Sequence, residues 1–327
     1  MFPFFVRTPG LIPILALCVH AQSFTPAALH AFDGGTVSRH SVRAPDPPAV
    51  LTASSDRVLI NVSVLDRNGR PLRGLRASSF RLFEHGAEQT ILSVNETETP
   101  VSVVIVFDES GSMEKGVARC AQAVKQFWKG SSDGDEFGLI TFSDQPTIQT
   151  EFTRDSTAIQ TRLMEAKSHG HTALLDALQS AAVLSRRAHN GRRAIIVLSD
   201  GGENHSQRRE WEVKRTLLKT AAQVYAVSVP QHQLFDDPDA KAEPGLLDRI
   251  CGATGGRNVG IDGFSDLESA MKQINDEIRA EYVLAYKPRS LSHDGKFHPV
   301  RLKFAPPSGV REVAVFWRPG YYDSWRF

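Results

Sequence analysis

Two apolar runs in this chain each stop abruptly at an aspartate. Residues Val101–Phe107 read V-S-V-V-I-V-F and end at Asp108, and residues 194–199 read A-I-I-V-L-S and end at Asp200. Runs rich in Val and Ile, without regular polar alternation, are typical of strands buried on both faces of a sheet. The pattern therefore predicts two strands of a parallel sheet that helices cover on both sides.

Helical patterns alternate with strand patterns from about residue 100 to 280. Apolar residues recur at i, i+3, i+4 and i+7 from Val117 to Trp128, which indicates one buried helical face. Further strands are expected over 136–142, 147–152 (an edge strand) and 223–229, and further helices over 156–167, 173–188, 208–221, 246–253 and 266–279. Such alternation predicts an α/β fold with a doubly wound, mainly parallel sheet.

Segments with the strand period of two lie on either side of this α/β block. Val58, Ile60, Val62 and Val64 alternate with other residues, and more strands are expected over 80–84, 90–94, 282–286, 298–304 and 310–317. Neither flank has enough strands to bury its own apolar face. The chain ends of a doubly wound domain commonly lie close together. We therefore expect the α/β domain to be inserted into one β-sandwich that both flanks form, with two separate small β elements as the rival arrangement.

The N-terminal segment resembles an export signal. Arg7 supplies a positive region, Leu11–Val19 a short apolar core, and Ala21 a small residue at a cleavage site. The organisation expected is a signal peptide (1–21), a linker or disordered arm (22–55), the first sandwich half (56–98), the α/β domain (99–280) and the second sandwich half (281–327). The mature protein would be secreted or lie in the periplasm or cell envelope, with no transmembrane segment.

Charge and cysteine content narrow the possible partners and crosslinks. A formal net charge of +1 in 327 residues gives no indication of a nucleic-acid partner. Cleavage would remove Cys18 and leave Cys120 and Cys251, which could form one disulfide or stay as two buried thiols. We favour buried thiols, because Cys120 falls on the apolar face of its helix.

Oxygen-bearing side chains follow the two apolar runs. Asp108, Ser110 and Ser112 alternate where a strand turns into a helix, Thr172 lies where another helix begins, and Asp200 ends the second run. Hard oxygen ligands of this kind suit a Mg²⁺-sized ion with one coordination position left free. Asp-x-Ser-x-Ser alone also fits a capping turn. Position favours a site, because open α/β sheets bind ligands beyond the carboxyl ends of their strands.

The set Asp-x-Ser-x-Ser, then Thr, then Asp resembles the metal-ion-dependent adhesion site of von Willebrand factor type A domains. Residues 57–322 are similar to an exported, acidobacterial-type group of von Willebrand factor A-related proteins, most specifically in the Asp108 loop, the Ser199–Gly201 segment and the ending Arg318–Tyr322. The resemblance implies the strand order 3-2-1-4-5-6, with the switch between the strands that end at Asp108 and Asp200. It implies a divalent ion held by Asp108, Ser110, Ser112, Thr172 and Asp200. The second aspartate, Asp200, would act through a water molecule.

The resemblance also implies a protein ligand that completes the ion's shell with a Glu or Asp carboxylate. Mg²⁺ suits the site best, with Mn²⁺ or Ca²⁺ as alternatives. Glu109 and His171 are expected at the rim. The long segment 230–245 should deliver Leu234, Phe235, Asp236 and Asp237 to the same edge and set specificity, unless it is only a solvated excursion.

The chemistry favours binding over catalysis. His169, His171 and His205 lie on loops near Ser110, but no nucleophile elbow, His-Glu-x-x-His motif or phosphate loop is present. We therefore expect no enzyme, and rank a metal-dependent hydrolase below two other functions. The first is an adhesion-type binding module, and its alternative is an envelope scaffold whose metal ion serves only structure.

Overall fold

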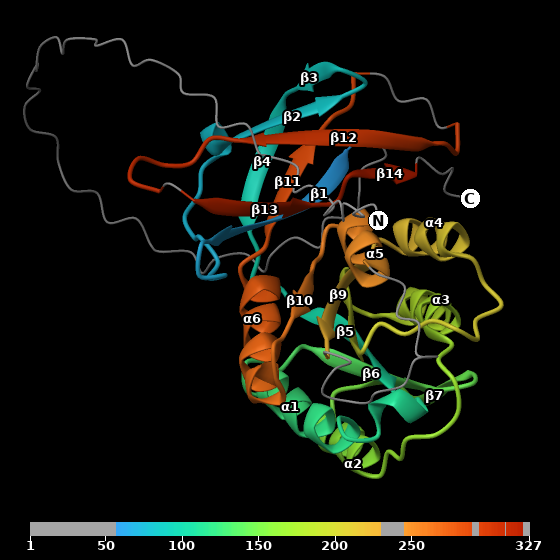
Figure 1. The fold of residues 1–327 in the computed structure, drawn as a ribbon. Coiled ribbons are helices and arrows are strands. Elements are labelled where there is room, and N and C mark those ends of the chain that lie inside the picture. Colours follow the sequence, from blue (N-terminus) through green and yellow to red (C-terminus); the bar gives the residue numbers. More distant parts are fainter. Residues whose placement is uncertain (1–56, 230–244, 290–293, 311, 323–327) are drawn as a thin grey trace, which may run out of the picture. The chain divides into compact units, whose positions relative to one another are not determined.

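The structure is a computed structural model that describes residues 57–229, 245–289, 294–310 and 312–322. Figure 1 shows an α/β domain and a β-sandwich. The expected signal peptide and arm (1–55) and most of segment 230–245 lie outside the described residues. Among the helices that the structure describes, none is long and apolar enough to span a membrane.

A six-stranded sheet forms the centre of the α/β domain. Its order is β10-β9-β8-β5-β6-β7, and every neighbouring pair is parallel except β6 with β7. Numbered along the domain, this is the expected order 3-2-1-4-5-6, with β7 antiparallel at one edge. The strands are β5 (Val101–Asp108), β6 (Glu136–Phe142), β7 (Pro146–Thr153), β8 (Arg192–Ser199), β9 (Gln223–Ser228) and β10 (Asn258–Gly260).

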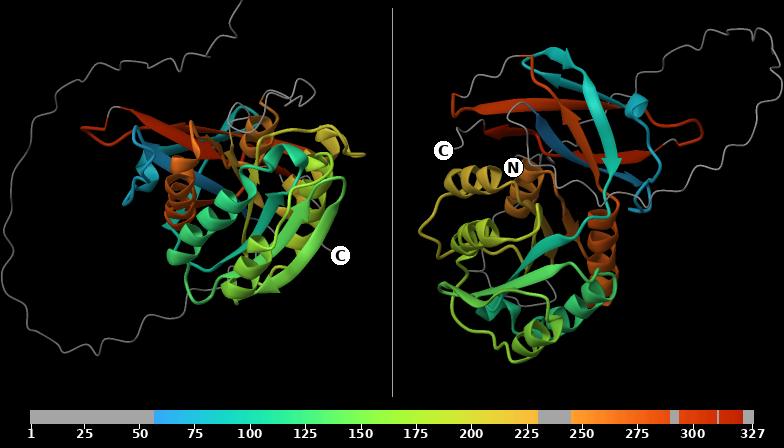
Figure 2. Two further views of the ribbon diagram at one scale, coloured as in Figure 1. Left: turned by 60° about the horizontal axis from the view of Figure 1, so that its bottom comes forward. Right: turned by 180° about the vertical axis from the view of Figure 1, so that it is seen from behind.

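Helices cover both faces of this sheet (Figures 1 and 2). Val103, Ile105 and Phe107 of β5 pack with helices α1, α2 and α6, whereas Val104 and Val106 pack with α3, α4 and α5. Both sets are apolar because the strand is buried on both faces, which confirms the doubly wound fold. The helices are α1 (Val117–Lys129), α2 (Ser156–Met164), α3 (Leu174–Leu184), α4 (Glu210–Thr220), α5 (Leu246–Thr254) and α6 (Leu267–Arg279).

The flanking segments together form the β-sandwich, which confirms the inserted arrangement. One sheet has the order β13-β1-β11-β4 and the other β14-β12-β2-β3, so each combines strands from before and after the α/β domain. Ile60 of β1 pairs with Leu284 of β11, and Val64 pairs with Val315 of β13. The strands are β1 (Val58–Asp66), β2 (Phe80–Glu84), β3 (Ala87–Gln89), β4 (Ile91–Glu96), β11 (Tyr282–Tyr286), β12 (Phe297–Phe304), β13 (Val313–Trp317) and β14 (Gly320–Tyr322).

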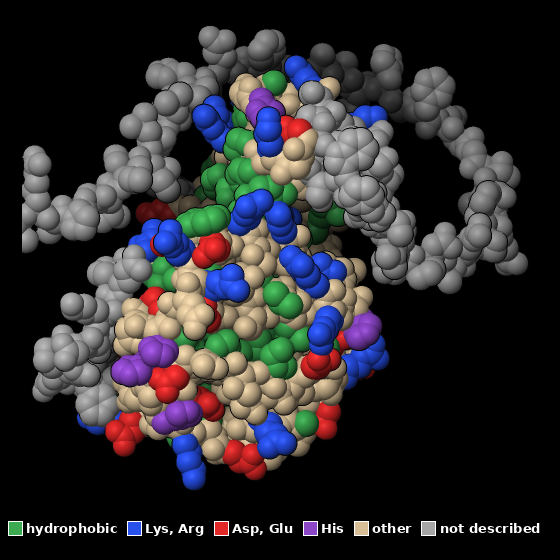
Figure 3. Space-filling model, turned by 90° about the vertical axis from the view of Figure 1, so that its right-hand side faces the viewer, with side chains coloured by type: hydrophobic (Ala, Val, Ile, Leu, Met, Phe, Trp, Pro, Cys, Tyr) green, Lys and Arg blue, Asp and Glu red, His purple; other side chains and the backbone are tan. Residues whose placement is uncertain are grey.

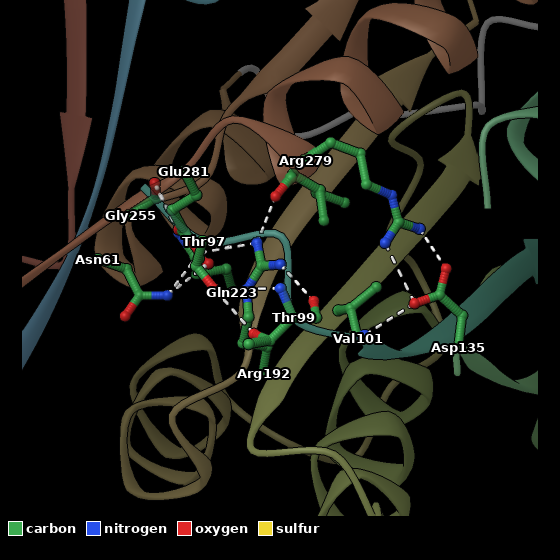
Figure 4. Close-up of polar contacts among 11 residues, drawn as sticks. Asn61, Thr97, Thr99, Val101, Asp135, Arg192, Gln223, Gly255, Arg279 and Glu281 are labelled. Atoms are coloured by element: carbon green, nitrogen blue, oxygen red, sulfur yellow. Dashed lines mark hydrogen bonds and ion pairs between the residues drawn. The ribbon is translucent and has the colours of Figure 1, made fainter. Parts of the chain in front are cut away.

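Polar contacts join the sandwich to the α/β domain (Figure 4). The side-chain amide of Asn61, in β1, donates to Glu281 Oε2 at 2.7 Å and to Gln223 Oε1, in β9, at 3.2 Å. The Arg192 guanidinium, in β8, donates to the Thr99 carbonyl at 2.9 Å and lies 3.4 Å from Glu281 Oε2. The two parts are therefore connected through buried charge as well as through the chain.

Cys120 and Cys251 are free and buried, as expected. Cys120 lies in the apolar cluster on one side of the central sheet and Cys251 in the cluster on the other side. Burial raises the pKa of the Cys120 thiol to about 12, which keeps it protonated.

Candidate metal centre

The candidate site lies where β5 and β8, neighbouring parallel strands, end at the same edge of the sheet. Asp108 is the last residue of β5 and is fully buried, and Asp200 follows β8 directly and is also buried. Apolar packing on both faces fixes these strands, so the carboxylates are placed by the sheet rather than by loops. Each apolar run forms a buried strand, and the aspartate at its end is thereby placed at the edge of the sheet.

Two hydrogen bonds orient the Asp108 carboxylate. The backbone N–H of Ser110 donates to Oδ1 at 2.9 Å, and the Ser199 hydroxyl donates to Oδ2 at 2.5 Å. Burial first, and the nearby charge of Asp200 second, raise the pKa of Asp108 to about 7. Two carboxylates are therefore close enough to repel each other in a region shielded from water.

The two serines of the Asp108 loop face each other. Ser110 Oγ and Ser112 Oγ are 3.1 Å apart, at the start of a 3-10 turn over Gly111–Met113. Ser110 is buried and Ser112 is half-buried. Ser110 thus contacts the Asp108 carboxylate through its backbone and its side chain, and the Ser112 hydroxyl lies next to that of Ser110.

Thr172 and Asp200 approach each other around Gly202. A Cβ atom added at Gly202 would lie 3.1 Å from Asp200 Oδ1 and 3.5 Å from Thr172 Oγ1. The Gly202 N–H donates to Asp200 Oδ1 at 2.9 Å, and the Asn204 side chain accepts from the Thr172 N–H at 2.8 Å. The missing side chain at Gly202 therefore lets this backbone pass close to both groups.

Backbone hydrogen bonds connect the loops that carry these residues. The Gly111 N–H donates to the Gly170 carbonyl at 3.0 Å, and the Ala173 N–H donates to the Ser143 carbonyl at 2.8 Å. The Asn204 N–H donates to the Thr172 carbonyl at 3.1 Å. The structure thus brings the five predicted ligand residues to one edge, on three loops that contact one another.

The donor set fits a hard divalent cation. Asp200 Oδ2 is buried and accepts no hydrogen bond from any described residue. Buried oxygens of this kind are normally satisfied, and an unpartnered one indicates an ion or water. Two carboxylates and three hydroxyls are oxygen ligands of the type that Mg²⁺ prefers, and a cation between the carboxylates would remove their repulsion.

The described rim residues differ in exposure. Glu109 is half-buried, and burial is the main cause that raises the pKa of its carboxyl group. His171 is exposed, stacks on His205 with ring centroids 5.0 Å apart, and donates its N–H to Asp144 at 2.8 Å. Histidine and acidic side chains gather on the face of the α/β domain in Figure 3. Leu234, Phe235, Asp236 and Asp237 lie outside the described residues.

Sequence reasoning assigned no role to the residues that support the ligands and the rim residue His171. Ser199 orients Asp108, Asn204 holds the Thr172 backbone, and Asp144 accepts from His171. A polar residue at the end of an otherwise apolar strand was the one available indication, and it applies only to Ser199. The other two act across loops that are distant in sequence.

Residues 103–203 match the family model for the von Willebrand factor type A domain. This chain carries a von Willebrand factor type A domain. No curated protein sequence matches the chain. Its resemblance to the exported acidobacterial-type group stays a prediction.

Three solved structures are similar to parts of this chain. An aerotolerance-related membrane protein from Bacteroides fragilis, with multiple mutations to serines, is 20% identical, with 54% of this chain and 98% of that chain covered and a TM-score of 0.44. BatB from Bacteroides thetaiotaomicron is 22% identical, with 54% and 97% covered and a TM-score of 0.44. A von Willebrand factor type A protein from Catenulispora acidiphila is 13% identical, with 80% and 73% covered and a TM-score of 0.49.

Proposed function

We propose that the von Willebrand factor A domain of this chain holds Mg²⁺ and binds an acidic side chain of a partner protein through it. The observation that carries the proposal is the buried Oδ2 atom of Asp200, which has no hydrogen-bond partner among the described residues and lies beside the buried carboxylate of Asp108. Asp108, Ser110, Ser112 and Thr172 would hold the ion together with Asp200. Ser199 and Asn204 would keep Asp108 and Thr172 in position.

The small negative charge of the donor set supports the choice of an acidic ligand. Only Asp108 and Asp200 carry charge, whereas Ser110, Ser112 and Thr172 offer neutral hydroxyls. A bound Mg²⁺ would supply an electrophilic position that favours an anionic oxygen. A Glu or Asp of a partner protein provides such an oxygen, so the domain would bind in a metal-dependent way.

We infer a binding role rather than an enzymatic one from the contacts of the nearby serine and histidine. Ser143 Oγ lies 3.0 Å from His169 Nε2, the spacing of a nucleophile and its base. Ser143 is buried, however, its backbone carbonyl accepts from the Ala173 N–H, and the backbone N–H of His169 donates to the Glu109 carbonyl. These contacts favour a role in joining the loops of the site.

A metal titration tests the proposed site. Isothermal titration of the full chain with Mg²⁺ or Mn²⁺ should show binding, and Asp108→Ala should abolish it while the circular dichroism spectrum stays unchanged. His189→Asn is the matched control, because its side chain is 78% exposed and bonded to Glu136, which begins β6 at the opposite end of the sheet. Equal affinity in the Asp108→Ala variant would remove the site assignment.

A chelator experiment tests the function and separates it from the scaffold alternative. The full chain is used as bait for envelope proteins in Mg²⁺, in EDTA, and in EDTA followed by excess Mg²⁺. A binding module should lose its partner in EDTA, recover it on adding Mg²⁺, and lose it in Asp108→Ala. A partner retained under all conditions would support a structural metal ion instead.

We further infer that the protein acts after export, with residues 1–21 removed as a signal peptide. The support is the charged, apolar and small-residue order in this segment. Mass spectrometry of protein recovered from the envelope or medium should give a chain that begins at Gln22. A chain that retains Met1 would contradict this inference.

A further inference from the structure

A second group of possible metal ligands lies in the sandwich, in the sheet β14-β12-β2-β3. Glu84 is the last residue of β2, His85 follows in the turn to β3, and His298 belongs to β12. Their potential ligand atoms all lie within 4.8 Å of one another. None of these residues belongs to the site on the α/β domain.

Strand register explains why residues so far apart in sequence meet. Glu84 pairs with Val300 in the antiparallel ladder between β2 and β12. His298 lies two residues before Val300, so its side chain points to the same face of the sheet as those of Val300 and Glu84. The turn after Glu84 then places His85 beside His298. Glu84 and His298 are buried, whereas His85 is exposed.

The spacing of the ligand atoms suits a tetrahedral ion. His85 Nε2 and His298 Nδ1 are 3.2 Å apart, and His298 Nδ1 and Glu84 Oε1 are 3.5 Å apart. Ligands about 2.0–2.1 Å from a tetrahedral Zn²⁺ are separated from one another by about 3.3–3.4 Å. These two separations bracket this value.

Neighbouring groups orient the ligands as they do around zinc. His298 Nε2 lies 3.1 Å from Asp294 Oδ1, and a neutral ring that donates from Nε2 to this carboxylate turns its Nδ1 lone pair toward Glu84 and His85. Tyr321 donates to Glu84 Oε1 at 2.9 Å, and Tyr286 donates to Oε2 at 3.2 Å. A histidine that is held by a carboxylate on its far nitrogen is the usual arrangement behind a zinc ligand.

We propose that Glu84, His85 and His298 form a Zn²⁺ site in the β-sandwich. Two imidazole nitrogens and one carboxylate are the donor types that Zn²⁺ takes, whereas Mg²⁺ prefers oxygen alone. Three protein ligands leave a fourth position. Because His85 is exposed, this position faces the solvent and takes water or a group from another molecule.

The test uses the full chain without a histidine tag, stripped of metal. Zn²⁺ is titrated in excess Mg²⁺ so that the site at Asp108 is occupied, and Co²⁺ serves as a coloured substitute whose visible absorption reports tetrahedral coordination. His85→Asn is the principal variant, because Asn tolerates the positive φ of 48° at this turn position and the residue is exposed. Glu84→Gln is the second variant, and it removes the carboxylate charge while keeping the shape.

The proposal predicts one Zn²⁺ bound in the wild type and in Asp108→Ala, with a tetrahedral Co²⁺ spectrum. His85→Asn and Glu84→Gln should each lower Zn²⁺ affinity on the order of tenfold or more. His189→Asn should bind Zn²⁺ as the wild type does. Equal Zn²⁺ affinity in the wild type and in His85→Asn would mean that His85 and His298 are only hydrogen-bonded to each other and bind no ion. If Asp108→Ala loses Zn²⁺ binding while His85→Asn and Glu84→Gln keep it, Zn²⁺ binds at the Asp108 site and not in the sandwich. Either result overturns the proposal.

Discussion

Ser199 shows how one side chain can prepare a metal ligand without being one. Its hydroxyl donates to Asp108 Oδ2 at 2.5 Å, and both residues are fully buried. In Ser199→Ala the Asp108 carboxylate loses this partner and can rotate, so Mg²⁺ affinity should fall about tenfold. Isothermal titration of the full chain measures the change.

The start of β5 offers a matched control for this substitution. Ser102 Oγ donates to Glu136 Oε1 at 2.5 Å, so it too is a buried serine bonded to a carboxylate, but at the opposite end of the strand. Ser102→Ala should lower the free energy of unfolding by about 1–3 kcal/mol and leave Mg²⁺ affinity unchanged. If both variants change Mg²⁺ affinity equally, general destabilisation explains the effect and Ser199 has no positioning role.

At the scale of elements, an ion-pair cluster fixes helix α4 against α5. Arg249 of α5 donates to Glu210 of α4 at 2.8 Å, and Lys214 lies one turn along α4 and contacts the same carboxylate. Hydrogen bonds from Arg249, and then from Lys214, lower the pKa of Glu210 to about 2. A carboxyl group in the unfolded chain has a pKa of about 4.3.

This difference predicts an acid dependence of stability. Because the folded pKa is lowered, the contribution of Glu210 is fully present above pH ~4.3 and is lost as the pH falls toward about 2. Glu210→Gln should therefore be less stable than the wild type at pH 6, by under about 1 kcal/mol because solvent screens the cluster. Urea unfolding should show a smaller stability difference between the wild type and Glu210→Gln at pH 3 than at pH 6, and 1 M salt should reduce this difference at pH 6. A stability difference that does not depend on pH or salt would exclude an electrostatic cause.

The elements that the sequence predicts best are those with long patterns. β5 and β8 are continuous apolar runs, and α1 repeats its apolar face over several turns, so both kinds were recognisable. The strands β3, β10 and β14 were missed because three residues carry too little periodicity to identify a strand. The ends of α2 and α3 were placed too far along the chain, since capping geometry is not visible in a hydrophobic pattern.

The two candidate metal sites differ in how much of their geometry a local sequence pattern contains. Asp108, Ser110 and Ser112 lie within one turn, so their chemistry is local and can be read from the chain. His85 and His298 are 213 residues apart and meet only because β2 and β12 pair across the inserted domain. No local pattern could have brought them together, and the register of the sandwich had to be known first.

At the scale of the whole molecule, the junction between the sandwich and the α/β domain contains a buried ion pair. Arg192 and Glu281 have side chains 10% and 2% exposed, and burial is the main cause that raises the pKa of Glu281. Arg192→Ala would leave this carboxylate buried without its counter-charge, which should cost about 3–5 kcal/mol of unfolding free energy. The deficit should shrink as the pH falls and Glu281 takes up a proton.

An exposed pair provides the comparison for Arg192→Ala. Arg187 and Glu151 also form an ion pair, but their side chains are 62% and 63% exposed. Arg187→Ala should therefore change the unfolding free energy by less than about 1 kcal/mol. Urea unfolding of both variants at pH 7 measures the contrast. Similar losses of unfolding free energy in the two variants would show that burial does not strengthen the ion pair at the junction.

A double variant tests whether Arg192 and Glu281 act as one unit. Arg192→Met with Glu281→Gln removes both charges together, while the amide oxygen at position 281 can still accept from Asn61, which now donates to Glu281 at 2.7 Å. Replacing both members of a buried pair avoids the uncompensated charge that makes single changes costly. The double variant should thus be more stable than the sum of the two single losses predicts, by about 1–3 kcal/mol of coupling energy. Strictly additive losses would mean that the carbonyls of Thr99 and Ile278, which Arg192 also contacts, fix the junction without help from Glu281.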